Sequence, residues 1–166
     1  MNFMKRMLTA FCLFFVLASS AQVTKDDINL VQAMYGKDKR DLMQEYMTFK
    51  DTAKATAFWK MYDSYEAERK KLGQGFIAIL QDYGTHYATL NDAKADALIT
   101  RMAANNQAFE NLYKKYYGQM KPVVGALKAS QFLQLEGYLR SVVKTNILSQ
   151  IPFIGEIDRT KVNNLK

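Results

Sequence analysis

The strongest constraint on the fold is a run of apolar residues at helical spacing, without a proline, in residues 58–87. At about 100° per residue these side chains fall within roughly 40° of one line. The pattern predicts a single amphipathic helix that begins at Asp51 or Thr52 and continues to about His86, a length on the order of 50 Å. The residues on the line are Phe58, Tyr62, Tyr65, Arg69, Leu72, Phe76, Leu80, Tyr83 and Tyr87.

Two further helices are expected downstream. Thr89 with Asp92 three residues later matches a capping box, which predicts the start of a second long helix. Pro122 and Gly125 are expected to bend or end it, and a third helix is expected from residues 128–130 until Pro152. The apolar faces are Leu98, Met102, Phe109, Leu112, Tyr116 and Met120 on the second helix, and Phe132, Leu135, Leu139, Val142, Val143 and Ile147 on the third.

A shorter helix is expected near the N-terminus, where Thr24 and Asp27 match another capping box. It carries Ile28, Val31, Met34 and Tyr35, is interrupted at Gly36, and resumes through Leu42 and Tyr46. The fold class is therefore all-α: an elongated antiparallel bundle or hairpin of four to five helices, two of them long. Residues 22–152 form one helical domain, and residues 153–166 are expected to be a polar, loosely ordered tail.

The first 21 residues have the pattern of a secretory signal peptide: basic Lys5 and Arg6, a short apolar run, and small residues up to Ala21. An uncleaved anchor is the alternative. Cleavage predicts a periplasmic or secreted protein without a membrane span. It also removes Cys12, the only cysteine, which excludes disulfides, zinc thiolates and a cysteine nucleophile from the mature chain.

The mature chain is moderately basic, because loss of Lys5 and Arg6 leaves 21 of 23 basic residues against 16 acidic ones, a charge of about +5. Export and the mixing of both signs argue against nucleic acid as a partner. Unfolded polypeptides, envelope proteins with acidic patches and anionic surfaces are the expected partners. A charged surface that only keeps the protein soluble is the alternative.

Catalytic groups are scarce. His86 is the only histidine, and the nearby Asp92 and Asp96 are better explained as helix-cap and turn residues than as metal ligands. Glu66 precedes Lys70 by four residues, which predicts a solvated surface pair. We therefore expect neither an enzyme nor a metal or cofactor site; a hydrolase that uses His86 is the remaining alternative.

Arg69 interrupts the apolar line, where an unpaired guanidinium would be unfavourable. We expect a structural ion pair between Arg69 and Glu136, at the edge of the third helix's apolar face; an arginine that extends to solvent is the alternative. The aromatic line itself is expected to be mostly core. The candidate partner-binding residues lie beside it or on the second long helix: Trp59, Tyr113, Lys114, Lys115 and Tyr117.

Residues 57–65 (AFWKMYDSY) and 127–136 (LKASQFLQLE) resemble segments of the small exported helical proteins of the Spy and CpxP group. Leu127 and Gln131 match the group's Leu-Thr-x-x-Gln signature, with Lys128 in place of the threonine. The resemblance implies an elongated helical cradle, often an antiparallel homodimer, that binds unfolded proteins without ATP or restrains an envelope stress sensor. We therefore expect a chaperone-like or stress-associated binding protein; a regulatory or structural module for one specific envelope protein is the alternative.

Overall fold

The chain forms a bundle of helices in a computed structural model that describes residues 38–164, apart from the side chains of residues 158 and 161–164. This part contains five α-helices, one short 3-10 turn and no β-strand, which confirms the all-α prediction. The predicted signal peptide and the predicted helix before Gly36 lie outside the described residues. The elements are α2 (Lys39–Tyr46), α3 (Thr52–His86), η1 (Tyr87–Thr89), α4 (Asp92–Val124), α5 (Ala126–Leu148) and α6 (Ile154–Asn164).

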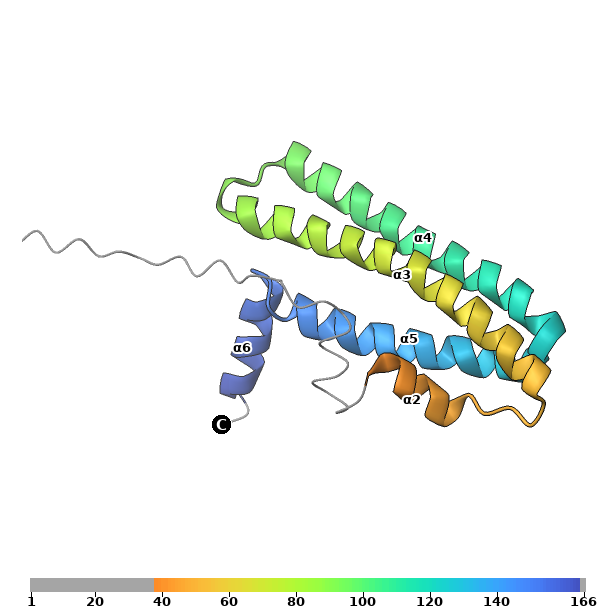
Figure 1. The fold of residues 1–166 in the computed structure, drawn as a ribbon. Helices are drawn as coiled ribbons and strands as arrows, with labels where there is room; N and C mark the ends of the chain where they lie inside the picture. Colours follow the sequence, from red (N-terminus) through yellow and green to blue (C-terminus); the bar gives the residue numbers. More distant parts are fainter. Residues whose placement is uncertain (1–37, 165–166) are drawn as a thin grey trace, which may run out of the picture.

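Figure 1 shows an elongated arrangement in which α3 and α4 form an antiparallel hairpin and α5 returns alongside them. The short helix α2 lies against α5 at one end, where the three long helices converge. Toward the other end α5 diverges from α3, and α6 turns away from the end of α5. Among residues 38–164, no helix combines the length and the apolar character that crossing a membrane requires.

The helix starts agree only in part with the predicted caps. The Asp51 side chain accepts hydrogen bonds from the backbone N–H groups of Ala53 and Lys54, which confirms Asp51 as the cap of α3. The predicted capping box at Thr89 is wrong, because Thr89 lies in η1. Its hydroxyl donates a hydrogen bond to the carbonyl oxygen of His86, the residue that precedes this turn. Asn91 caps α4 instead, accepting a hydrogen bond from Lys94 N at 3.0 Å.

A single residue separates α4 from α5. Gly125 has φ 86°, a backbone conformation that costs a residue with a Cβ but not glycine. Pro122 lies inside the last turn of α4 and does not end it, so Gly125 alone marks the break. The third predicted helix therefore starts earlier than expected, at Ala126, and it ends at Leu148 before Pro152.

Most of the residues on the apolar faces predicted from the period lie in the interior of the bundle. Tyr87, at the end of the predicted line, is an exception: it belongs to η1 and is exposed. Rings from α3, α4 and α5 meet at the converging end, and mostly aliphatic side chains fill the diverging end. The first cluster contains Met43, Met47, Phe58, Tyr62, Tyr65, Leu112, Tyr116, Met120, Ala129 and Phe132; the second contains Leu42, Phe76, Leu80, Leu139, Val143, Ile147 and Ile151.

The expectation of a loosely ordered tail is wrong, because residues 154–164 form the helix α6. Ile154 packs against the aliphatic cluster at Ile151, and this contact attaches the start of α6 to the core. Gly155 passes so close to Ser149 that a Cβ would lie 2.7 Å from the Ser149 carbonyl oxygen. The polar composition of the segment concealed Ile154, which anchors it.

Candidate functional site

A network of charged side chains is buried where α2, α3 and α5 meet. The Lys39 ammonium donates to Glu66 Oε1 at 2.6 Å and to Glu136 Oε2 at 2.7 Å. Arg69 Nε donates to the same Glu66 oxygen at 2.9 Å, and the Tyr65 hydroxyl donates to Glu136 Oε2 at 2.8 Å. Two carboxylates therefore share two cations and a phenol inside the bundle, and we call these five residues the buried polar network.

Burial makes the charges of this network interdependent. The Glu136 side chain is 1% exposed, and its second oxygen, Oε1, has no hydrogen-bond partner among the described residues. Burial by itself would raise the pKa of Glu66, but the adjacent Lys39 and Arg69 more than offset this and lower the pKa. Burial and the Glu136 carboxylate raise the pKa of Tyr65, so its hydroxyl stays protonated and remains a donor.

Arg69 and Glu136, between which an ion pair was expected, both belong to the buried polar network. Arg69 contacts Glu66, whereas Glu136 contacts Lys39, so Lys39 and Glu66 connect the two. A direct bridge between Arg69 and Glu136 stays a prediction. The expected surface pair of Glu66 with Lys70 is wrong, since the Glu66 side chain is only 15% exposed and faces the network.

Lys39 is the charged network residue to which the sequence analysis assigned no role, whereas Glu66 was assigned to the wrong partner. A signal for it exists, because Lys39 lies three and four residues before the buried Leu42 and Met43, on the same face of α2. A lysine on an apolar face is ordinarily explained by an aliphatic stem whose ammonium reaches water. Here the ammonium points inward, toward the two carboxylates.

The aromatic line of α3 surrounds this network as packing, not as an open surface. Phe132 makes edge contacts with three rings of α3, at centroid distances of 5.6 Å to Phe58, 6.1 Å to Tyr62 and 5.1 Å to Tyr65. All four side chains are buried. The rings therefore hold α3 and α5 together, as the sequence analysis expected for most of the line.

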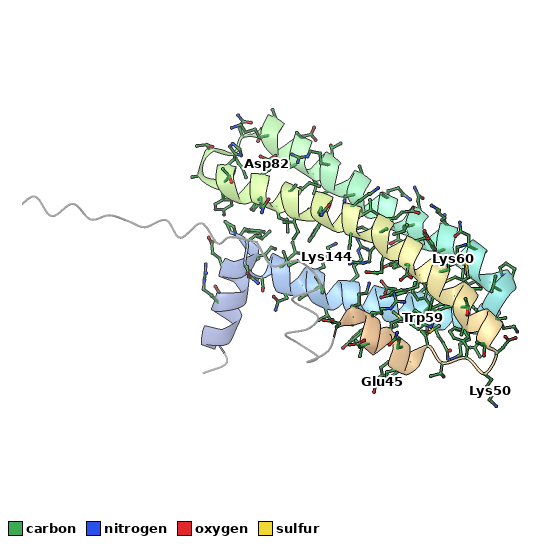
Figure 2. The ribbon with its side chains drawn as sticks, viewed as in Figure 1. Glu45, Lys50, Trp59, Lys60, Asp82 and Lys144 are labelled. Atoms are coloured by element: carbon green, nitrogen blue, oxygen red, sulfur yellow. The ribbon has the colours of Figure 1, made fainter. Side chains whose placement is uncertain are left out.

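A cavity of about 40 Å³ lies beside the network, between α3, α4 and α5. The guanidinium carbon of Arg140 lies 3.8 Å from the centroid of the Phe109 ring. Its Nη2 atom donates a hydrogen bond to Asn106 Oδ1 at 3.1 Å. Lys144 is labelled in Figure 2 between α5 and α3, and burial next to Arg140 lowers its pKa. The lining residues are Lys39, Arg69, Gly73, Phe76, Phe109, Glu136, Leu139, Arg140, Val143 and Lys144.

An open groove of about 380 Å³ lies between α3 and α4. Its rim includes an ion pair in which Lys115 Nζ lies 2.7 Å from Glu68 Oε1, and the Tyr116 hydroxyl donates to the same oxygen at 2.8 Å. These two hydrogen bonds lower the pKa of Glu68, while burial and the bond to Glu68 raise the pKa of Tyr116 to about 12. The groove is lined by Glu68, Lys71, Leu72, Ala108, Asn111, Leu112 and Lys115.

The structure does not bring the candidate partner-binding residues together on one surface. Trp59 is half-buried against Phe58 and Tyr62, at centroid distances of 5.0 and 5.3 Å. On α4, the half-buried Tyr113 stacks on Tyr65. Lys115 lies about 200° further round the same helix and lines the groove.

Tyr117 and Lys114 complete the predicted set. Tyr117 is half-buried and lies beneath the ammonium of Lys121, 5.9 Å from its ring centroid, and Lys114 is exposed. Of the five candidates, Lys115 lines the groove described above.

His86 is held within its own helix. Its Nδ1 atom lies 3.0 Å from Asp82 Oδ1 and 2.9 Å from the Asp82 carbonyl oxygen. Asp82 also pairs with Arg101, whose hydrogen bond lowers the Asp82 pKa. The Thr89 hydroxyl donates to the His86 carbonyl oxygen and does not reach the ring. Within residues 38–164, no group of three or more histidine, cysteine or acidic side chains is arranged to hold a metal ion.

No family model matches this chain, and the comparisons with curated proteins and with solved structures also found no match. The likeness to the Spy and CpxP group stays a prediction, on the sequence segments given above.

Proposed function

We propose that the chain is an exported binding protein without catalytic activity, which holds short extended segments of unfolded or envelope proteins without ATP. The observation that carries the proposal is the open groove on the α3–α4 hairpin, which is lined by both apolar and charged side chains. Its volume of about 380 Å³ is within the range of sites that bind peptides or small molecules.

The chemistry of the groove suits an extended polypeptide. The half-buried Leu72 and Ala108 offer apolar contact, and Lys71 and Lys115 provide positive charge beside them. Weak contacts of this mixed kind favour adaptable binding, and the positive charge accelerates the capture of acidic segments. The signal-peptide pattern and the resemblance to the Spy and CpxP group support a location in the cell envelope.

The burial of the aromatic line favours a second candidate function. Because Phe58, Tyr62, Tyr65 and Phe76 are buried, they cannot form a continuous aromatic groove for many clients. A small binding surface is more typical of a module that recognises one specific envelope protein. In that case the groove would fit one sequence closely.

The first test is suppression of aggregation. Reduced α-lactalbumin serves as the model client, with the mature chain added without ATP at substoichiometric to several-fold amounts. We expect Leu72→Glu, which places a charge in the groove, to lose at least half of the protection. Leu127→Glu is the matched control, because Leu127 is 73% exposed on α5, away from the groove. Circular dichroism checks that both variants are folded.

No protection by the parent chain at several-fold excess would contradict the chaperone-like proposal. Equal loss in both variants would place binding elsewhere than in the groove. The second candidate predicts a different result: one dominant partner in a pull-down from an envelope extract, lost with Leu72→Glu, and no general protection of α-lactalbumin.

A further inference from the structure

The cavity of about 40 Å³ between α3, α4 and α5 has an excess of positive charge. The ionisable side chains that line it are the cations Lys39, Arg69, Arg140 and Lys144 and the carboxylate Glu136. Lys39 and Arg69 are paired with the two carboxylates of the buried polar network. The two cations of α5, Arg140 and Lys144, have no carboxylate partner within residues 38–164.

Arg140 and Lys144 are held on the same side of α5. They lie four residues apart, a spacing at which like charges on a helix repel each other. The guanidinium of Arg140 is fixed over the Phe109 ring and by its hydrogen bond to Asn106, so it stays on the wall of the cavity. Burial beside Arg140 lowers the pKa of Lys144, as expected for an ammonium without a counter-ion. An anion in the cavity would compensate both charges.

Glu136 adds a second and independent requirement. Its Oε2 atom accepts hydrogen bonds from Lys39 and Tyr65, whereas its Oε1 atom has no partner among the residues that the structure describes. The side chain is 1% exposed and lines the same cavity, and a buried acceptor without a donor is unfavourable. An anion without a hydrogen would only be repelled by this carboxylate. An anion with a hydroxyl group could donate to it.

We propose that this cavity binds a small oxyanion that keeps a hydroxyl proton, such as bicarbonate, with its charged oxygens at Arg140 and Lys144 and its hydroxyl at Glu136 Oε1. The volume of about 40 Å³ exceeds the roughly 10–15 Å³ that one water molecule needs, so a small planar ion has room. Apolar walls at Phe76 and Val143 strengthen the attraction between the ion and the two cations. The cavity shares no lining residue with the groove of the proposed function, so this is a separate site.

The test is a titration of the isotopically labelled mature chain, residues 22–166, with sodium bicarbonate at pH 7.5 in a sealed NMR tube. Sodium chloride keeps the ionic strength constant. We expect saturable shifts of the amide signals of residues 139–144 on α5 and 73–76 on α3. So small a ligand cannot bind more tightly than about 0.04 mM, given the limit on binding free energy per heavy atom. Sodium nitrate is the matched probe, because nitrate has the same charge and planar shape but no hydroxyl. It is expected to bind at least about tenfold more weakly, since Glu136 Oε1 would stay without a donor.

Two variants test the two ends of the site. Lys144→Met removes one cation and is expected to weaken bicarbonate binding at least about tenfold. Lys50→Met is its matched control, because Lys50 is exposed and points away from the protein in Figure 2, and it is expected to leave the affinity unchanged. Glu136→Gln supplies an amide that can donate, so it is expected to abolish the preference for bicarbonate over nitrate.

Three results would overturn the proposal. The first is a set of shifts in the parent chain that do not saturate or that spread over the whole surface. The second is equal affinity of the parent chain for bicarbonate and nitrate, a comparison that needs no variant and therefore holds even if Glu136→Gln does not fold. The third is equal affinity of Lys144→Met and Lys50→Met for bicarbonate. No client protein takes part in these measurements, so they separate this proposal from the proposed function.

Discussion

Replacing Lys39 with methionine is the most direct test of the buried polar network. The variant keeps most of the apolar stem but removes the ammonium, which contacts Glu66 at 2.6 Å and Glu136 at 2.7 Å. Glu136, 1% exposed, would then keep only the Tyr65 hydroxyl of its donors in the network. Removing one partner of a buried ion pair typically costs about 3–5 kcal/mol, a large part of the roughly 5–15 kcal/mol that stabilises a domain.

Equilibrium unfolding in urea, followed by the fluorescence of Trp59, the only tryptophan, measures this loss. A change of that size would lower the urea midpoint by roughly 2 M. Lys50→Met is the matched control, because Lys50 is exposed and extends away from the protein in Figure 2. Its effect is expected to stay within about 0.5 kcal/mol.

The double variant Lys39→Met/Glu136→Met separates the loss of the ion pair from poor packing. Removing both charges eliminates the uncompensated carboxylate, so most of the lost stability is expected to return. The Tyr65 hydroxyl would then lack its acceptor, which leaves a deficit of about 1–3 kcal/mol. The reasoning is refuted if Lys39→Met is no worse than Lys50→Met, or if the double variant is as unstable as the single one.

Two further predictions concern acid stability and helix capping. Because the folded state lowers the pKa of Glu66, its carboxylate stabilises the fold above about pH 4.3, the usual value for glutamate, and this contribution is lost as the pH falls through the lowered value. The difference in unfolding free energy between the parent chain and Glu66→Gln, measured by urea unfolding from pH 7 to pH 3, is therefore expected to shrink on acidification. Glu110→Gln is the control, because Glu110 is exposed, and its difference from the parent chain is expected to stay constant. A constant difference for Glu66→Gln would contradict the prediction. Asn91→Ala is expected to cost about 0.5–2 kcal/mol through loss of the α4 cap, whereas Thr89→Ala should cost less, and the reverse order in thermal unfolding would restore Thr89 as the cap.

Much of the fold could be predicted because its signals are local. The 3.6-residue period identified most of the buried face of α3, and Asp51, one of the two expected starts, is its cap. The errors arose where neighbouring structure competes with a local pattern. Thr89 matched a capping box but was taken up by a 3-10 turn, and the polar residues of α6 concealed its anchoring by Ile154.

The candidate site was much less predictable. The position of Arg69 on the apolar line and of Glu136 at the edge of its helix's apolar face predicted an ion pair between these two residues. Lys39 and Glu66, which connect them in the structure, were not identified as their partners. The groove was represented by Lys115 alone, because a hollow between two helices depends on how their side chains pack and not on the period of either helix.

The sequence by itself determined that this protein is a set of amphipathic helices with stops such as Gly125, because hydrophobic period, caps and backbone conformation depend on residues a few positions apart. The tertiary structure alone decided which charges meet, since Lys39 is separated from Glu66 by 27 residues and from Glu136 by 97. Contacts over such separations are set by how α2, α3 and α5 pack, and that packing also places most of the aromatic line in the interior.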